Sequence, residues 1–232
     1  NAGVNQTLEH LGMMRGKKEE ALNCFEQARL AAPDDPAILN DLVTAELQCK
    51  KYAEAEMNIR KLLANKEYAD RRDLKLQRAR CLVELQRPTD AREVLVKLTN
   101  DDSGSADVPA WIELGKVSYQ LKDNNRARMA AARLVAIAPD RPEGYQLRAM
   151  LFRRLGALDQ AHDNAQKAVA LAPTAENYVL YAMIERQLGH AQAAEASFGK
   201  ALELEPTNAI ALAQLSDMRN GTTAVAGVET KD

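Results

Sequence analysis

The feature that most constrains the fold of this chain is an internal repeat. Alanine marks the same place in six successive segments, at Ala21, Ala55, Ala91, Ala127, Ala161 and Ala194. These marker alanines are separated by 34, 36, 36, 34 and 33 residues. A repeat of this length holds one pair of helices, and a lone pair cannot bury its apolar face. The sequence therefore predicts a stack of helix hairpins, each packed against its neighbours.

The fullest copy of the repeat is the segment Ala110–Pro139. It contains Trp111, then Leu114 and Gly115, then the marker alanine Ala127, and it closes with a proline. This order resembles the tetratricopeptide repeat, W-x2-L-G followed by a second-helix alanine and a terminal proline. The resemblance implies an all-α, right-handed superhelical solenoid of antiparallel helix pairs. It also implies a non-enzymatic protein that binds other proteins.

The repeat divides the chain into six predicted units within a single solenoid, residues 1–220. A capping helix and a short tail are expected to follow the last unit. The predicted boundaries are 2–35, 36–71, 72–107, 108–141, 142–174 and 175–208 for the units, 208–220 for the cap and 221–232 for the tail. Two units depart from the pattern, because Glu46 stands where an aromatic residue is expected and Arg78 where leucine is usual.

Helix starts and turns can also be predicted from single residues. Asp35 precedes a proline, and Thr174 opens the last unit, so both are expected to cap helix N-termini. Gly156 and Gly189 lie between the two helices of their units. Glycine adopts the left-handed backbone conformation that ends a helix at least cost, which makes these positions predicted hairpin turns.

Composition and motifs exclude several functions. The net charge is −2 and the sequence pI is about 6.0, which disfavours nucleic acid as a partner. No apolar run is long enough to cross a bilayer. Cys24, Cys49 and Cys81 lack C-x-x-C spacing and are interpreted as free thiols, with Cys81 buried and Cys24 more exposed.

The sequence gives no support for catalysis, a metal or a cofactor. It contains no phosphate-binding glycine loop and no G-x-S-x-G elbow. His162 and His190 lack metal-ligand spacing and are interpreted as surface polar residues. His10 lies at a groove position, where a pH-sensitive contact is the weaker of two interpretations. The predicted protein has no cofactor and is not an enzyme.

In the family that this chain resembles, the first helices of the repeats line a concave partner-binding surface. Counting along each unit places one predicted set of residues on that surface. The set is Leu76, Arg80, Ile112, Lys116, Tyr119, Gln146, Met150, Arg153, Val179, Met183 and Arg186. It supplies one cation per unit beside apolar residues. We therefore expect a basic, partly apolar groove for a peptide with acidic groups or a free C-terminus, the alternative being a solvated face.

Two further hypotheses concern the partner. Some family members bind the C-terminal carboxylate of heat-shock chaperones, but Asp41 and Asp73 stand where that binding site needs asparagine and lysine. A scaffold for assembling a bacterial envelope or pilus complex is the leading analogy. The alternative is a sensor or regulatory domain of a larger polypeptide truncated upstream, since the sequence begins at Asn1. Cytoplasmic and periplasmic or envelope-associated locations both stay open.

The last hypothesis concerns the tail, residues 221–232. It ends in Glu229, Asp232 and a carboxylate, and it contains Val225 and Val228. These groups complement the basic residues expected in the groove. The tail is therefore predicted to lie in the groove of its own chain or of a second copy, where it would act as a stand-in for the partner and allow self-association.

Overall fold

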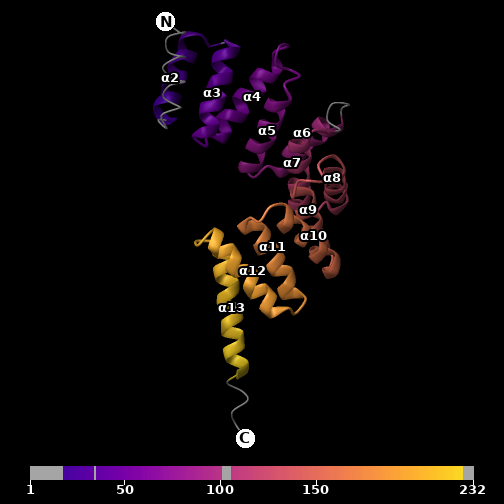
Figure 1. Ribbon diagram of the computed structural model, residues 1–232. Helices are drawn as coiled ribbons and strands as arrows, with labels where there is room; N and C mark the ends of the chain where they lie inside the picture. The colour runs from indigo at the N-terminus through magenta and orange to yellow at the C-terminus, as the bar shows by residue number, and fades with distance from the viewer. Residues whose placement is uncertain (1–17, 34, 101–105, 227–232) are drawn as a thin grey trace. The chain divides into compact units, whose positions relative to one another are not determined.

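The computed structural model describes residues 18–33, 35–100 and 106–226 (Figure 1). Within these ranges every regular element is an α-helix. The chain separates into two compact units, unit 1 with residues Asn1–Glu113 and unit 2 with residues Leu114–Asp232. The division falls inside helix α7 (Val108–Gln120), so that this helix contributes one part to each unit. The fold is an all-α repeat fold.

Unit 1 is a series of helices in which each one packs against the next. It holds α2 (Lys18–Ala31), α3 (Pro36–Gln48), α4 (Tyr52–Ala64), α5 (Arg72–Glu84), α6 (Pro88–Asn100) and the start of α7. Contacts join α2 to α3, α3 to α4, α4 to α5 and α5 to α6. The marker alanines Ala21 and Ala55 are buried in its core with Phe25, Leu42 and Ile59. The absence of bulk at the alanines lets neighbouring helices approach closely.

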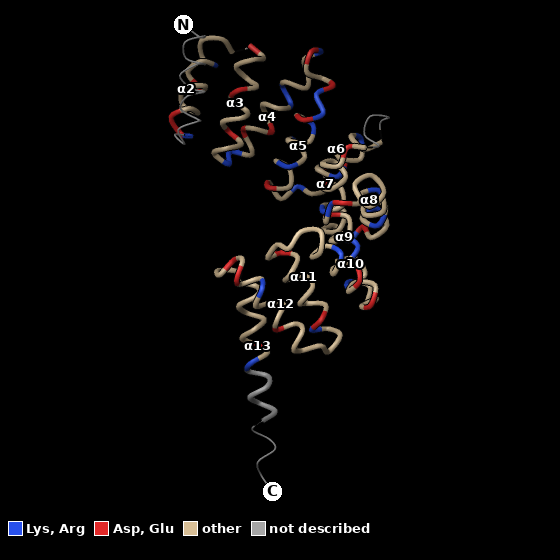
Figure 2. Tube along the Cα trace, in the orientation of Figure 1, with Lys and Arg blue, Asp and Glu red and all other residues tan. Residues whose placement is uncertain are grey.

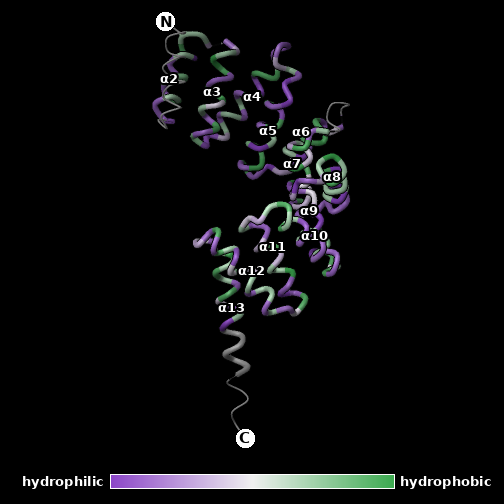
Figure 3. The backbone as a smooth tube through the Cα atoms, viewed as in Figure 1, coloured by the Kyte–Doolittle hydropathy of each residue, from purple (hydrophilic) through white to green (hydrophobic). Residues whose placement is uncertain are grey.

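Unit 2 continues the same plan. It holds the end of α7, then α8 (Asn124–Ile137), α9 (Glu143–Arg154), α10 (Leu158–Leu171), α11 (Ala175–Gln187), α12 (Ala191–Leu204) and α13 (Ala209–Ala226). Consecutive helices from α8 to α13 pack together, and α9 also packs against α11, one repeat further on. Hydrophobic and hydrophilic positions alternate along these helices (Figure 3), as expected for helices that bury one stripe each.

The predicted helix starts are confirmed. Asp35 accepts hydrogen bonds from the backbone N–H groups of Ala37 and Ile38, at 2.9 and 3.4 Å. The hydroxyl oxygen of Thr174 accepts one from the N–H of Asn177 at 3.3 Å. Each side chain satisfies N–H groups that have no partner within their own helix, and this fixes where α3 and α11 begin.

The predicted glycine turns are confirmed as well, and three similar turns lack glycine. Gly156 and Gly189 have φ angles of +76° and +83°. Lys50, Gln86 and Lys122 each have a φ of 58° and lie two residues beyond the end of the first helix of their hairpins. A side chain with a Cβ adopts this conformation at a cost, so these three turns are less favourable than the glycine turns.

Gly115 illustrates why a small residue is needed where two helices meet. A Cβ atom placed on it would lie 2.4 Å from Cδ2 of Leu147, a side chain buried in unit 2. Such a distance is well inside van der Waals contact, so the Leu147 side chain would have to move before α7 and α9 could keep this separation with a larger residue at position 115.

The last helix is longer than the sequence predicted. We expected the cap to end at Asn220, but α13 continues to Ala226, so that the first part of the predicted tail is helical. Ala211 and Leu215 of α13 are buried in a core cluster with Phe198 of α12. Residues 221–226 are therefore helical rather than extended, binding of the tail in a groove stays a prediction, and residues 227–232 lie outside the described part of the chain.

Three smaller expectations can be compared with the described residues. The cysteines are free, with Cys24 exposed, Cys49 partly buried and Cys81 buried, as predicted. Burial raises the pKa of the Cys81 thiol to about 11. Over the described ranges, no helix combines the length and the apolar character that crossing a membrane requires.

Candidate functional site

The candidate site is the face that the first helices of the repeats present within each unit, where predicted groove residues contact residues of the next repeat. In unit 1, Nε of Arg80 on α5 donates to Oε1 of Glu113 on α7 at 2.8 Å. In unit 2, Gln146 donates to Asn177, and Nη1 of Arg153 donates to the sulfur of Met183 at 3.3 Å. These contacts join α5 to α7 in unit 1 and α9 to α11 in unit 2, so in each of these two pairs one face of a first helix is turned toward the next first helix.

The same series of contacts reaches the last helix of unit 2. Nη1 of Arg186 on α11 donates to Oε1 of Gln214 on α13 at 2.5 Å. Gln214 was not among the residues predicted for the groove. The helix that closes unit 2 therefore takes the place of a further first helix in this series of cross-repeat contacts.

A pocket opens on this face in unit 1. It has a volume of about 420 Å³ and is lined by Leu47, Tyr52, Gln77, Arg80, Val83, Glu84 and Glu113. Of these, only Arg80 was in the predicted set of binding residues. The pocket brings together one guanidinium and two carboxylates, and the guanidinium is already paired with Glu113. The expected basic groove is therefore not found in this part of unit 1.

The predicted residues of unit 2 fall into two groups. Lys116 and Arg186 are exposed, whereas Gln146, Met150, Arg153 and Met183 are partly buried. Val179 is only 6% exposed and belongs to the core cluster that includes Ala182 and Phe198. It cannot contact a partner, because α11 uses this position to pack against α12 rather than to line a groove. Met150 and Met183, expected to be exposed, are half-covered by neighbouring helices.

The remaining predicted residues, Leu76 and Ile112 in unit 1 and Tyr119 in unit 2, are partly buried. The guanidinium of Arg154 lies 3.4 Å from the ring centroid of Tyr119, and its Nη2 donates to the Tyr119 carbonyl oxygen at 2.8 Å. This cation–π contact joins the end of α9 to the end of α7. Tyr119 therefore offers a partner only the part of its ring that Arg154 leaves uncovered.

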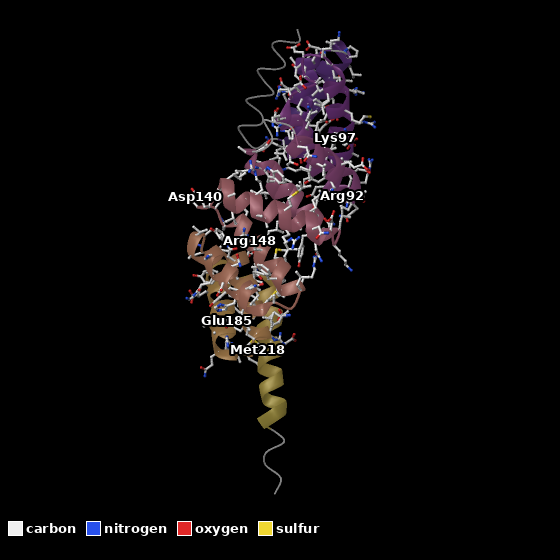
Figure 4. The ribbon with its side chains drawn as sticks, turned by 90° about the vertical axis from the view of Figure 1, so that its right-hand side faces the viewer. Arg92, Lys97, Asp140, Arg148, Glu185 and Met218 are labelled. Atoms are coloured by element: carbon white, nitrogen blue, oxygen red, sulfur yellow. The ribbon has the colours of Figure 1, made fainter. Side chains whose placement is uncertain are left out.

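A buried polar cluster in unit 2 was missed by the sequence analysis. Glu185 is 3% exposed, and its two oxygens lie 2.9 Å from Nε2 of His162 and 2.6 Å from Nδ1 of His190. The hydroxyl of Tyr181 lies 3.0 Å from the same nitrogen of His162. Both histidines were interpreted as surface polar residues, but they hold a buried carboxylate on α11, which is labelled in Figure 4.

The electrostatics of this cluster are set by its hydrogen bonds. Burial alone would raise the pKa of Glu185, but hydrogen bonds from Tyr181, His190 and His162 together outweigh burial and hold the pKa below its ordinary value. Burial and the neighbouring Glu185 carboxylate raise the pKa of Tyr181 to about 12. In the described residues, no group of three or more His, Cys, Asp or Glu side chains is arranged to hold a metal ion. The cluster is a structural contact between α10, α11 and the start of α12.

Stacked helix hairpins with a contact face of side chains are typical of protein-interaction scaffolds of the helical repeat class, a class that is generally non-enzymatic. Two tetratricopeptide repeat models match the sequence, one over residues 15–70 and 76–142 and the other over residues 175–208. The chain belongs to the tetratricopeptide repeat family. Proteins of this family bind protein partners.

Solved structures show the same fold at low sequence identity. The type IV pilus biogenesis factor PilW is 19% identical with a TM-score of 0.74, covering 92% of this chain and 98% of PilW. A tetratricopeptide repeat protein from Parabacteroides merdae is 20% identical with a TM-score of 0.71, covering 94% of this chain and 84% of its own.

The pilF protein of Pseudomonas aeruginosa is 16% identical with a TM-score of 0.70, covering 93% of this chain and 97% of its own. Comparison of the sequence with curated proteins gives no significant match. At these identities the solved structures establish the similarity of fold and nothing finer.

Proposed function

We propose that this chain binds a segment of a partner protein along its first-helix face and thereby helps to assemble a multiprotein complex of the bacterial envelope or pilus type. The observation that carries the proposal is the open pocket on that face in unit 1, whose walls come from α3, α5 and α7 and the start of α4. Walls from several helices suit a segment that crosses successive repeats.

The pocket chemistry suggests what the segment carries. Leu47 and Val83 offer apolar surface, and Glu84 adds a carboxylate beside the Arg80–Glu113 pair. A partner segment with an apolar side chain and a cation fits this part better than an acidic one. In unit 2, the exposed cations Lys116 and Arg186 favour acidic groups instead. The proposed preference for acidic or C-terminal segments is thus confined to unit 2.

The assignment to envelope or pilus assembly is an analogy, supported by the similar folds of PilW, a type IV pilus biogenesis factor, and of pilF. A photo-crosslinking amino acid at Val83 or at Met150 should capture one and the same protein in source cells. Matched positions on second helices, Glu93 and Gln166, are exposed and serve as controls. Equal capture from all four positions, or none from the first two, would show that the first-helix face is not the binding surface.

A further inference from the structure

A pocket of about 480 Å³ lies between α8 and α9 in unit 2. It is lined by Asn124, Asn125, Arg128, Ala132, Arg148, Leu151, Phe152 and Leu155. None of these residues belongs to the predicted groove. Leu155, at the end of α9, leaves 62% of its surface exposed although it is a large apolar side chain. The pocket therefore combines an uncovered apolar wall with two arginines and two asparagines.

The helices that form this pocket are strongly basic. Helix α8 contains three arginines and no acidic residue, and α9 contains three arginines and one glutamate. Figure 2 shows this as blue segments along α8 and α9. The concentration is notable in a chain whose net charge is −2. A local excess of one sign attracts ligands of the other sign.

Most of these arginines are occupied by contacts within unit 2. Arg126 pairs with Asp123, Arg153 with the sulfur of Met183, and Arg154 with Asn124 and Tyr119. Among the described residues, Arg128 and Arg148 have neither a hydrogen bond nor an ion pair. Both line the pocket, and Arg148 is labelled in Figure 4.

An equivalent junction in unit 1 has a carboxylate beside its arginine, which the lining of the α8–α9 pocket lacks. Glu56 directly follows the marker alanine Ala55, and Arg78 directly precedes the buried Ala79. Nε of Arg78 donates to Oε1 of Glu56 at 2.8 Å, which joins α4 to α5 across two repeats. An arginine at this place is thus neutralised by a carboxylate of the preceding helix.

In unit 2 the same two places are both occupied by arginine. Arg128 directly follows the marker alanine Ala127, and Arg148 directly precedes the buried Ala149. The carboxylate that pairs with Arg78 in unit 1 has been replaced by a second cation. Two like charges at one junction disfavour each other unless an anion lies between them.

A third junction shows that side chains at these two places do meet. His162 follows the marker alanine Ala161 and Tyr181 precedes Ala182, and the ring nitrogen and the hydroxyl lie 3.0 Å apart. We call these two positions, the residue after the marker alanine and the residue before the buried alanine of the next first helix, the junction pair of neighbouring repeats. The junction pair Arg128 and Arg148 is therefore expected to receive a shared partner from outside the chain.

We propose that the α8–α9 pocket is a second docking site, which binds an acidic segment of a partner protein. A carboxylate of the segment lies between Arg128 and Arg148, where Glu56 lies beside Arg78 in unit 1. A neighbouring leucine or phenylalanine of the segment covers Leu151, Phe152 and Leu155. The site uses the junction between repeats rather than the first-helix face, so it stands whether or not the proposed groove is correct.

The test uses the whole chain and a fluorescein-labelled peptide, Glu-Asp-Leu-Phe-Asp-Glu, measured by fluorescence anisotropy at low ionic strength. Its controls are the neutral analogue Gln-Asn-Leu-Phe-Asn-Gln and a single-stranded DNA hexamer. We expect the acidic peptide to bind at least about 10-fold more tightly than the neutral one, as a partly desolvated pair of charge-assisted hydrogen bonds would give.

The decisive variant is Arg128→Glu. It restores the charge pattern of Glu56 and Arg78, so the thermal midpoint should hold or rise while affinity for the acidic peptide falls at least about 10-fold. Arg148→Glu should lose affinity similarly. Lys167→Glu, at an exposed position on α10, should bind the peptide as the unchanged chain does. Arg186→Glu is measured beside it to separate the two sites, because Arg186 lies on the first-helix face that the proposed function assigns to a partner.

Four results would overturn the proposal. The first is an unchanged chain that does not bind the acidic peptide in preference to the neutral one, and the second is an Arg128→Glu variant that binds the acidic peptide as tightly as the unchanged chain does. Tighter binding of the DNA hexamer than of the peptide, lost in Arg128→Glu, would assign the pocket to nucleic acid instead. A loss of binding in Arg186→Glu alone would place the peptide on the first-helix face.

Discussion

Asn58 donates a hydrogen bond of 2.7 Å to Oε1 of Glu46 inside the core of unit 1, and the two residues are 3% and 4% exposed. Oε2 of Glu46 and Oδ1 of Asn58 have no hydrogen-bond partner. A protonated Glu46 carries an O–H group, which a carboxylate lacks. Burial raises the pKa of Glu46 to about 7, and the bond from Asn58 offsets this only in part.

This pair makes the stability of the chain depend on pH. The folded chain holds a proton on Glu46 up to about pH 7, whereas the unfolded chain releases it near the ordinary pKa of 4.5. The contribution of Glu46 is therefore most favourable below pH 4.5 and is lost as the pH rises to about 7. Glu46→Gln should remove this loss and stabilise the chain at pH 8 by about 1–3 kcal/mol.

Chemical denaturation at several pH values would measure this effect. Glu93→Gln, at an exposed position on α6, is the matched control and should keep the pH dependence of the unchanged chain. If Glu46→Gln loses stability between pH 5 and 7 as steeply as the unchanged chain does, the raised pKa of Glu46 is not the cause of the pH dependence of stability.

The hairpin turns allow a test of backbone strain. Lys122 has a φ of 58°, so Lys122→Gly should raise the free energy of unfolding by about 1 kcal/mol, the relief of left-handed strain minus the added chain entropy of glycine. Gly156→Ala should lower it by a similar amount, since a Cβ there meets no atom within 4 Å and only the backbone is affected. Urea midpoints measure both. Lys122→Ala keeps the Cβ atom. Equal midpoints for Lys122→Ala and Lys122→Gly would contradict the explanation that the Cβ atom strains the left-handed backbone.

The Glu185 cluster should make unit 2 sensitive to acid. Its hydrogen bonds hold the pKa of Glu185 below the ordinary value of 4.5, so the stability that they contribute is present above pH 4.5 and is lost as the pH falls through the folded pKa. Glu185→Gln weakens the bonds from His162 and His190 and should cost about 1–3 kcal/mol at pH 6.

Thermal melting at pH 6 and at pH 3.5 would compare the unchanged chain with Glu185→Gln. The difference in midpoint should be larger at pH 6 and should narrow at the lower pH, because the stability that the ionised carboxylate contributes begins to be lost below pH 4.5. Glu195→Gln, at an exposed position on α12, is the control. A constant difference across this range would mean that the ionised carboxylate is not what the cluster stabilises.

Removal of the last helix should expose the end of unit 2. Ala211 and Leu215 of α13 cover Phe198 of α12, so a chain ending at Asn208 would leave that aromatic ring open to solvent. We expect a lower thermal midpoint and concentration-dependent association, measured by circular dichroism and light scattering. The variant Leu212→Ser, at an exposed position on α13, should leave both unchanged. An unaltered midpoint and a monomeric shortened chain would exclude the capping role of α13.

The features that could be predicted from sequence are those that depend on neighbouring residues along the chain. The helix starts at Asp35 and Thr174 and the turns at Gly156 and Gly189 each need only a short local pattern, and each was predicted correctly. The helix that ends at Ala226 was predicted too short, because its glycine and paired threonines usually weaken a helix.

The features that could not be predicted depend on pairs from different repeats. Val179 shares a helical face with accessible residues, and only the packing of α11 against α12 shows that it is buried. His162 gave no motif on its own, since its partner Glu185 lies 23 residues away. The sequence does contain one signal of such a contact. Aligning the residue after each marker alanine with the residue before the buried alanine of the next first helix sets Arg128 against Arg148.

The junction pairs affect which hairpins can pack side by side in the stack. Each of the three compared here uses its own chemistry: a carboxylate with a guanidinium, two guanidiniums, and an imidazole with a phenol. Hairpins with nearly the same backbone are therefore not interchangeable, because transplanting one beside a different neighbour would mismatch its junction. The side chains at these two places therefore determine which neighbouring hairpin each hairpin packs against best, and they do so without altering the shape of any single hairpin.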